Sequence, residues 1–189
     1  MDMLIDKQKV ASSFSRAAVT YDSVAELQRD VGHTLMQRLP KELRSSAGPC
    51  VMDLGCGTGF FSPKLKQTYP TAQLFNVDLA LGMLRYAREQ RAVTGAHWIC
   101  ADAEHLPFAK GSMHLIFSSL AIQWCEDFPA LMQEIERVLA PGGQFVFATL
   151  GPNTLCELRT AWGQADRYTH VNQFLSSDEH LSALPDSLS

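Results

Sequence analysis

The chain has 189 residues, of which 46% are hydrophobic and 19% are charged, and a formal net charge of −4. This length suits one domain with a sizeable core, and the negative charge offers no general attraction to nucleic acid or anionic membranes. No apolar run is long enough to span a bilayer and no signal-peptide core is visible, so we expect a cytoplasmic protein without a nucleic-acid or membrane partner.

The first part of the chain predicts helices over about residues 6–39. Apolar residues recur there near helical spacing, and Pro40 with the polar run that follows it ends the pattern. We expect residues 1–49 to form an N-terminal helical cap.

From residue 50 the sequence alternates predicted strands and helices. Strands are expected at 50–54, 74–77, 98–100, 113–118 and 144–150, and helices at 60–68, about 81–87 and 129–139. Strands interleaved with helices predict a mostly parallel sheet with right-handed crossovers and helices on both faces. Residues 50–150 are therefore the expected α/β core.

The segment 151–189 is a partial C-terminal region. It offers one predicted helix at about 154–165 and a polar, serine-rich end at 176–189, with no further strand pattern. Phe145, Val146, Phe147 and Ala148 would then form an exposed apolar sheet edge, which invites pairing with another chain. We expect either a truncated form or a partner that covers this edge.

The cysteines predict neither disulfides nor a metal centre. They are odd in number and scattered, include no C-x-x-C pair, and are best explained as buried or incidental thiols in a reducing compartment. Their positions are Cys50, Cys56, Cys100, Cys125 and Cys156.

The most informative motif follows the first predicted strand. Asp53 ends that strand, and glycines follow at 55, 57 and 59. Glycine lets the backbone turn sharply and lets a ligand approach main-chain N–H groups. The spacing G-x-G-x-G differs from the dinucleotide pattern G-x-G-x-x-G, and Asp53 would repel a pyrophosphate but can accept hydrogen bonds from an ammonium group.

Acidic residues also end the next two predicted strands. Asp78 lies about 20 residues beyond the glycine turn, where a carboxylate can accept both ribose hydroxyls, although a helix-capping role is the alternative. Asp102 follows the third strand. Because parallel strands end at one rim, we expect Asp53, Asp78 and Asp102 to lie around one crevice.

These motifs resemble those of the class I S-adenosylmethionine (SAM) methyltransferases. Residues 51–61 resemble motif I, and 101–108 resemble a D-A-E-x-L-P-F signature. Residues 14–21 and 119–125 resemble the malonyl-acyl-carrier-protein O-methyltransferase family of biotin synthesis, as do 149–150, 155–162 and 172–175. The resemblance covers nearly the whole chain. The predicted sheet, however, lacks the sixth and seventh strands with which that fold normally completes it.

The resemblance implies a Rossmann-like fold, SAM as cofactor and a set of site residues. Three residues are expected to position the reaction: Tyr21, Gln123 and Trp124. The expected cofactor-binding residues are Arg16, Asp53, Gly55, Cys56, Gly57, Gly59, Asp78, Leu79, Met83, Asp102, Ala103 and Ser119. A solvated helix arginine, a core methionine and a core aromatic remain the alternatives for Arg16, Met83 and Trp124.

The implied reaction is methylation of the free carboxylate of a malonyl thioester on acyl carrier protein or coenzyme A. Such a carboxylate is ionised at neutral pH and needs no general base, which agrees with the absence of an obvious His–Asp or Cys–His pair; His105 and His114 are the nearest candidates. An acidic carrier protein would need local basic residues, whose alternative is solvated helix faces: Lys64, Lys66, Arg85, Arg88 and Arg91. Other small-molecule methyltransferases and a SAM-binding module without activity are the alternative functions.

Overall fold

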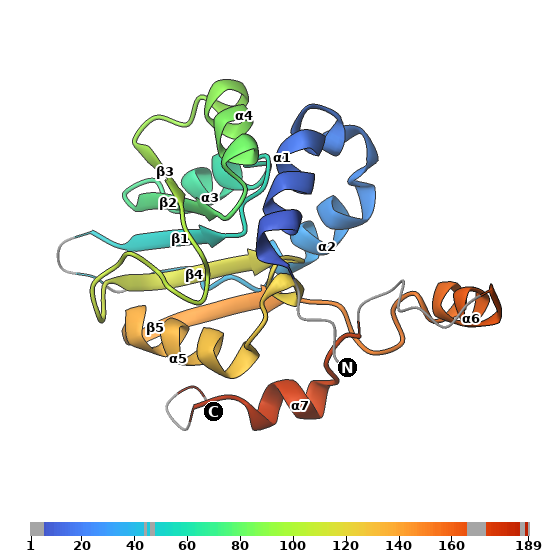
Figure 1. The fold of residues 1–189 in the computed structure, drawn as a ribbon. Coiled ribbons are helices and arrows are strands. Elements are labelled where there is room, and N and C mark those ends of the chain that lie inside the picture. The colour runs from blue at the N-terminus through green and yellow to red at the C-terminus, as the bar shows by residue number, and fades with distance from the viewer. Residues whose placement is uncertain (1–5, 44, 46–47, 166–172, 186–187, 189) are drawn as a thin grey trace.

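The computed structural model describes residues 6–43, 45, 48–165, 173–185 and 188. Five strands form one parallel sheet in the order β3-β2-β1-β4-β5 (Figure 1). The strands are β1 (Cys50–Leu54), β2 (Gln73–Asp78), β3 (Ala96–Cys100), β4 (Met113–Ser119) and β5 (Leu139–Ala148). The strand order reverses between β1 and β4, and in open α/β sheets ligands bind at the carboxyl ends of the strands beside such a reversal. The expected Rossmann-like architecture is confirmed.

Seven α-helices and one short 3₁₀ helix are found in the described residues. They are α1 (Lys7–Val24), α2 (Glu26–Met36), α3 (Ser62–Thr68), α4 (Leu81–Arg91), η1 (Ile122–Trp124), α5 (Phe128–Val138), α6 (Cys156–Ala165) and α7 (Ser177–Ser182). Aspartate side chains cap the first turns of α1 and α5: Asp6 accepts the Lys9 N–H and Asp127 accepts the Ala130 N–H. None of the helices in these residues is both long and apolar enough to cross a membrane.

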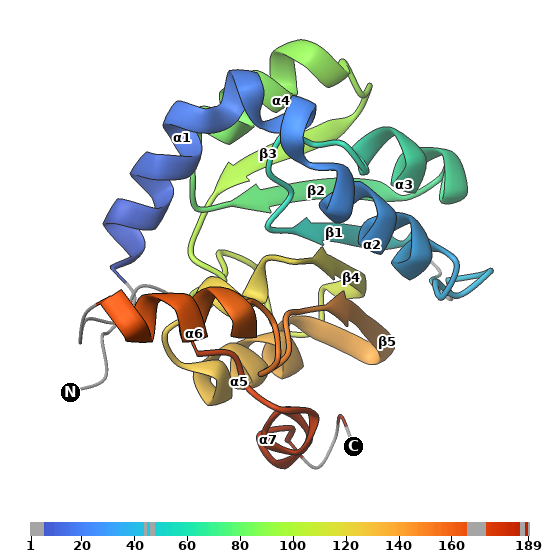
Figure 2. The same ribbon diagram turned by 90° about the vertical axis from the view of Figure 1, so that its right-hand side faces the viewer.

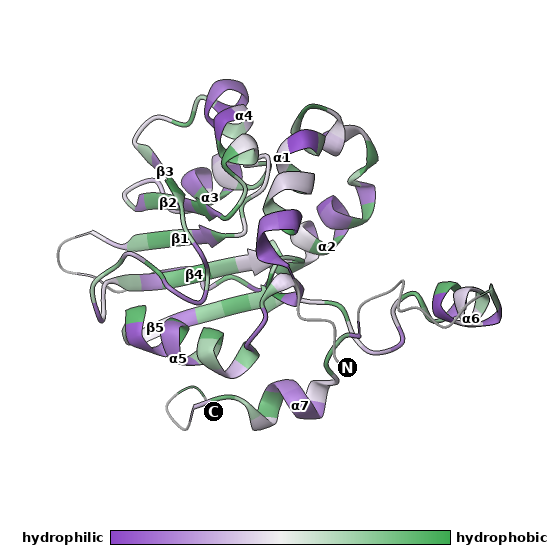
Figure 3. Cartoon of the chain, in the orientation of Figure 1, coloured by the Kyte–Doolittle hydropathy of each residue, from purple (hydrophilic) through white to green (hydrophobic). Residues whose placement is uncertain are grey.

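Helices cover both faces of the sheet. Because successive strand residues point to opposite sides, each strand contributes buried side chains to both layers. On one face Leu35 of α2 and Leu65 of α3 belong to a buried cluster with Phe117 of β4. On the other face, residues of α5 such as Ile135 pack with Met52 of β1. The hydropathy colouring shows the same arrangement, with apolar strands between the helices (Figure 3).

Helix α1 lies beside α4 at the carboxyl ends of the strands (Figure 2). The two helices approach closely at Gly82, whose N–H donates to Ser15 Oγ over 3.1 Å, and a Cβ at Gly82 would lie 2.7 Å from the Ser15 Cβ. Ala18 and Met83 complete the contact. The expected N-terminal region is thus divided, with α1 over the strand ends and α2 against the sheet.

The predicted element boundaries differ from the structure mainly in the second half of the chain. β3 begins two residues earlier than expected, and β5 begins at Leu139, which pairs with Met113 before the Pro141-Gly142-Gly143 segment interrupts the register. Helix α7 was not predicted. It is signalled by a capping box in which the Ser176 Oγ and Glu179 side chains bond each other's N–H groups.

Strand β5 is the edge of the sheet, and within the described residues no sixth or seventh strand pairs with it. Phe145 and Phe147 stack with ring centroids 4.7 Å apart, and the side chain of His180 from α7 lies against Phe128 and Phe147. The apolar residues of β5 are accordingly half-buried rather than fully exposed. Asn172, in one of the segments used for the resemblance, lies outside the described residues.

Candidate functional site

A cavity of about 400 Å³ opens at the carboxyl ends of the strands, bounded by α1 and the start of α2. Its volume is in the range of small-molecule binding sites. Most of the predicted site residues line it: Tyr21, Asp53, Gly55, Cys56, Gly57, Asp78, Leu79, Met83, Asp102, Ala103, Ser119, Gln123 and Trp124. The three strand-end aspartates therefore meet around one hollow.

The glycine turn is built from residues in the left-handed region of φ. Gly55 has φ of 73°, and a Cβ there would lie 2.1 Å from the Ala121 Cβ, so the approach of the β4 loop requires glycine. Gly57 has φ of 53° and donates its N–H to Asp78 Oδ2 over 2.8 Å. This bond joins the turn after β1 to the end of β2.

Asp53 is the most buried of the three aspartates. It is 3% exposed, and its Oδ2 has no hydrogen-bond partner among the described residues. Burial, and secondly the charge of Asp78, raise the pKa of Asp53 to about 8. A buried carboxyl group with a free oxygen facing a cavity fits a cationic ligand group such as an ammonium.

Asp78 is held by main-chain donors. Burial raises the pKa of Asp78, while the N–H groups of Ala80 and Gly57 oppose that effect. The Ala80 bond closes a turn before α4, whose N-cap is Ala80 without a side-chain hydrogen bond, so the helix-capping alternative for Asp78 is wrong and its side chain lies in the cavity wall.

Asp102 is bound by a lysine from the first turn of α1. Lys7 Nζ lies 2.7 Å from Asp102 Oδ2 and 2.7 Å from Glu104 Oε2. Burial works to raise the pKa of Asp102, but the hydrogen bond from Lys7 and the Glu104 N–H hold it below its ordinary value. The end of β3 is thereby fastened to α1.

Two further polar atoms in the cavity wall lack partners. Ser119 Oγ and Gln123 Oε1 are buried, and neither has a hydrogen bond in the part of the chain that the structure describes. Buried polar groups are normally satisfied, so with Asp53 Oδ2 these atoms indicate a polar ligand. Across the described residues, no cluster of three or more His, Cys, Asp or Glu side chains could hold a metal ion.

An aromatic group closes one side of the cavity. The Phe14 ring lies edge-on to Trp124, with centroids 5.6 Å apart, and to Tyr21 at 6.0 Å. Burial, followed by the charges of Asp78 and Asp22, raises the pKa of Tyr21, so its hydroxyl stays protonated and can donate a hydrogen bond.

The last turns of α1 are fastened to the glycine turn and to α4. The Asp22 carboxylate accepts a hydrogen bond from Thr58 Oγ1 over 2.6 Å and pairs with Arg91. Arg91 also donates from Nε to the Thr58 carbonyl over 2.9 Å. Helix α1 is thus held near both ends by ion pairs.

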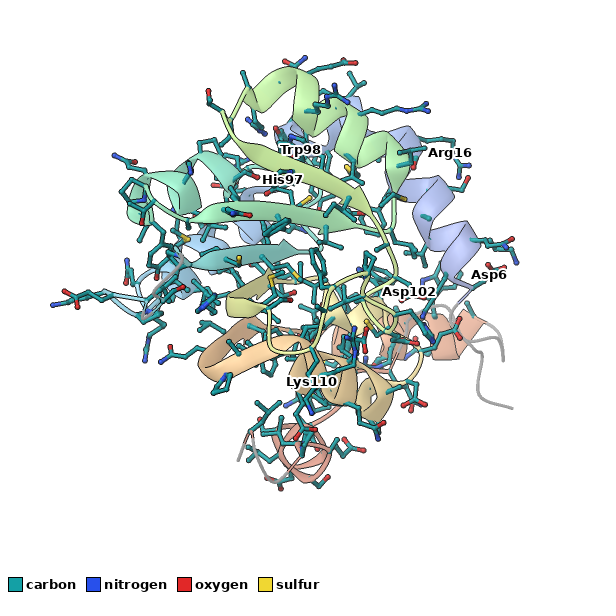
Figure 4. The ribbon with its side chains drawn as sticks, turned by 90° about the vertical axis from the view of Figure 1, so that its left-hand side faces the viewer. Asp6, Arg16, His97, Trp98, Asp102 and Lys110 are labelled. Carbon is teal, nitrogen blue, oxygen red and sulfur yellow. The ribbon has the colours of Figure 1, made fainter. Side chains whose placement is uncertain are left out.

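The structure does not bring two predicted cofactor-binding residues to the cavity. Arg16 is exposed on the outer side of α1, where its guanidinium donates to Ser12 and Ser13 of the same helix (Figure 4). Gly59 is not part of the cavity wall. A Cβ there would lie 2.8 Å from the Trp98 ring, and its φ of 68° favours glycine, so its lack of a side chain serves packing and the turn.

The candidate histidines also lie elsewhere. His105 is exposed and His114 accepts the Cys50 N–H through Nδ1; neither lines the cavity. Several residues of the cavity wall, on the N-terminal helices and after the glycine turn, are not among those predicted from the sequence. Phe14 and Phe60 lie in segments of the resemblance, 14–21 and 51–61, but neither was assigned to the site, and no local signal marks the others: Lys7, Asp22 and Arg29.

Comparison with known proteins gives a consistent result. Residues 52–147 match the family model described as a methyltransferase domain. The chain is 52% identical over 171 residues to the biotin biosynthesis bifunctional protein BioHC of Cellvibrio japonicus, covering 90% of this chain and 33% of that protein. It is 42% identical over 179 residues to the malonyl-[acyl-carrier protein] O-methyltransferase of Hahella chejuensis, covering 95% and 63%. The chain spans less than two thirds of the length of these relatives.

A solved structure shares the fold. A chain from the Haloferax volcanii complex between the Trm112 methyltransferase activator and a methyltransferase superposes with a TM-score of 0.75 at 23% identity, covering 92% of this chain and 75% of that one.

Proposed function

The chain belongs to the methyltransferase-domain family of class I SAM-dependent type, and from this premise we propose that it methylates the free carboxylate of a malonyl thioester. The observation that supports the proposal is the single cavity in which three strand-end aspartates and unpartnered polar atoms face one another. The names of the relatives supply the acceptor, malonyl-acyl carrier protein.

In this proposal each aspartate binds one part of the cofactor. Asp53 accepts hydrogen bonds from the ammonium group, and Asp78 accepts them from the ribose hydroxyls. Asp102 accepts one from the adenine amino group, the Ala103 N–H donates to a ring nitrogen, and Met83 lies beside the ring. When bound, SAM supplies a methyl group on a sulfonium centre, which needs no further activation by the protein. Asp53 Oδ2 then gains the partner that it lacks.

The acceptor is positioned by the residues that follow β4. Gln123 donates from Nε2 to the Leu120 carbonyl over 2.7 Å. This bond fixes the orientation of the side-chain amide, including its Oε1 atom. Trp124 and the protonated Tyr21 hydroxyl bound the same space. Their proposed task is to align the acceptor oxygen and exclude water.

A carboxylate acceptor suits this cavity because no proton has to be removed from it. Carboxyl groups ionise near pH 4, so the acceptor is already nucleophilic at neutral pH. Among the described residues no histidine lines the cavity. A phenol or carbon acceptor would call for a nearby base.

The proposed setting is an early step of biotin synthesis in the cytoplasm. Methylation removes a negative charge that is costly to bury, so the masked chain can enter apolar enzyme channels. All five cysteines are free thiols, which agrees with a reducing compartment. Malonyl-coenzyme A is the smaller proposed acceptor.

Incubation with radiolabelled SAM tests the proposal. We expect label to enter malonyl-acyl carrier protein and malonyl-coenzyme A as a base-labile ester, and not the acetyl thioesters, which lack the free carboxylate. Label in a phenolic or quinone-precursor acceptor alone would replace the proposal with another small-molecule methyltransferase. Calorimetric binding of SAM without transfer to any acceptor would leave only a cofactor-binding module.

The positioning roles need a second comparison. Tyr21→Phe and Gln123→Leu should lower kcat with little change in SAM affinity, because both side chains are proposed to face the acceptor. The matched control is Tyr86→Phe on α4, a half-buried tyrosine whose residue is not part of the cavity wall. Equal turnover in all three variants would remove both roles.

A further inference from the structure

Arg29, on the first turn of α2, is a cation at the cavity for which no role has been assigned. Its guanidinium lies 5.8 Å from the centroid of the Phe60 ring, and both residues line the cavity. One of its N–H groups donates to the Asp22 main-chain carbonyl. A guanidinium carries five N–H donors in a fork that matches a carboxylate, so several donors remain.

The surroundings of Arg29 are positively charged. Lys64 Nζ and Arg91 Cζ lie 5.2 Å and 5.6 Å from the same Phe60 centroid. The carboxylate of Asp22 is committed to Arg91 and Thr58. Among the ion pairs of the described residues none involves Arg29. Lys64 and Arg91 are not part of the cavity wall, but with Arg29 they make the cations around Phe60 outnumber the carboxylate of Asp22.

The ligand of the proposed function requires such a site. The amino-acid part of SAM is a zwitterion, and an ammonium group paired with Asp53 brings a carboxylate into the same cavity. An anion in a largely apolar cavity needs a cation or several donors.

Three cationic side chains compete for this role, and two are unsuitable. Lys7 lines the cavity, but its ammonium is bound by Asp102 and Glu104 at the end of β3. Arg16, which the sequence favours, points outward and bonds Ser12 and Ser13. In the part of the chain that the structure describes, Lys7 and Arg29 are the cationic side chains in the cavity wall.

We propose that Arg29, supported by the cations around Phe60, binds the carboxylate of the cofactor's amino-acid part. This inference rests on the proposed function and deepens it, because it makes Arg29 the residue that distinguishes an intact amino-acid tail from a decarboxylated one. Asp22 positions Arg29 through its main-chain carbonyl and limits the net charge through Arg91.

The test compares two ligands that differ only in this carboxylate: S-adenosylhomocysteine and its decarboxylated analogue, the 3-aminopropyl thioether of 5′-deoxyadenosine. Affinities are measured by calorimetry with the whole chain. The unmodified chain should prefer S-adenosylhomocysteine by about 10- to 100-fold, the range expected for a charge-assisted pair. Arg29→Gln should lose most of this preference by binding S-adenosylhomocysteine more weakly while holding the analogue unchanged.

Two matched variants control the experiment. Arg16→Gln removes the same charge from the neighbouring helix and should keep the full preference. Arg29→Lys keeps the charge but not the fork and should retain part of it. Circular dichroism and thermal unfolding establish that each variant is folded.

Each other outcome counts against the assignment. Equal weakening of both ligands in Arg29→Gln would show a packing effect, and loss of preference in Arg16→Gln would transfer the role to Arg16. In either case cofactor binding, and with it the proposed function, would stand. Failure of the unmodified chain to bind either ligand would overturn the proposed function and this inference together.

Discussion

Lys7 and Asp102, 95 residues apart in the chain, are joined by a hydrogen-bonded ion pair of 2.7 Å that fastens the first turn of α1 to the end of β3. The same ammonium group contacts the buried carboxylate of Glu104. Hydrogen bonds to these two acids outweigh burial and raise the pKa of Lys7. The pair therefore links the N-terminal helix to the region proposed for adenine.

Lys7→Met should lower the free energy of unfolding by about 1–3 kcal/mol, because it leaves two carboxylates near each other without their cation. Urea unfolding measures the change. The control is Lys9→Met, which removes an exposed pair with Asp6 and should have little effect. The pKa of Asp102 is lowered in the folded chain, so the Lys7 contribution should be present above pH 3.8 and disappear as pH falls through the lowered pKa. Equal stability of the two variants at pH 7 would contradict the prediction.

Ligand binding should release a proton from Asp53. With a pKa of about 8 this carboxyl is largely protonated at pH 6–7, whereas a bound ammonium favours the ionised form. The affinity for S-adenosylhomocysteine should rise between pH 6 and 7.5, by up to about tenfold per pH unit. Calorimetry in buffers of different ionisation heat counts the protons. The groups that face Asp53 are Asp78 and the Cys56 thiol, whose pKa burial raises well above its ordinary value. Asp53→Asn should abolish the pH dependence of this affinity. An affinity of the unmodified chain that does not change with pH would refute the proton release.

The same carboxyl predicts a slope in the stability of the ligand-free chain. Its pKa is near 3.8 when unfolded and about 8 when folded, so between these values the folded state holds a proton that the unfolded state has lost. Stability should fall as pH rises through this window, and Asp53→Asn should remove that part of the slope. Denaturant midpoints at pH 5 and pH 8 give the comparison.

Two helical glycines should respond in opposite directions to alanine. A Cβ at Gly32 of α2 would lie 2.1 Å from Phe61 Cζ, whose ring is packed against His33 and Phe117, so Gly32→Ala should destabilise the chain by about 1–3 kcal/mol. At Gly163 of α6 nothing lies within 4 Å, so Gly163→Ala should have no clash and raise helix propensity. Thermal unfolding compares them. Phe61→Leu combined with Gly32→Ala should recover part of the loss if the ring is the cause.

Sequence patterns predicted the sheet and the meeting of the aspartates because both depend on local signals. Asp53, Asp78 and Asp102 each end a strand, and parallel strands bring such ends together without further information. The choice between Arg16 and Arg29 depends instead on which side of α1 faces the cavity. That is decided by the contact of Ser15 with Gly82, 67 residues away. Helical spacing defines a face but not the partner that the face packs against. The binding roles of all these residues stay predictions.

Two other differences have similar causes. Lys7 was missed because its partners belong to a loop 95 residues away, which no spacing rule reaches. Helix α7 was missed because the serine-rich composition of the C-terminal segment outweighed its short capping signal.

The fastening of α1 at both ends has a kinetic consequence. Lys7 holds one end through Asp102 and Glu104, and Asp22 holds the other through Thr58 and Arg91. Helix α1 is therefore held over the cavity by ion pairs and hydrogen bonds as well as by apolar contacts. The side chains of these ion pairs are only 7–29% exposed, and salt screens such partly buried pairs much less than exposed ones. These contacts should therefore keep α1 over the cavity as ionic strength increases, and the residence time of a bound molecule should depend little on salt.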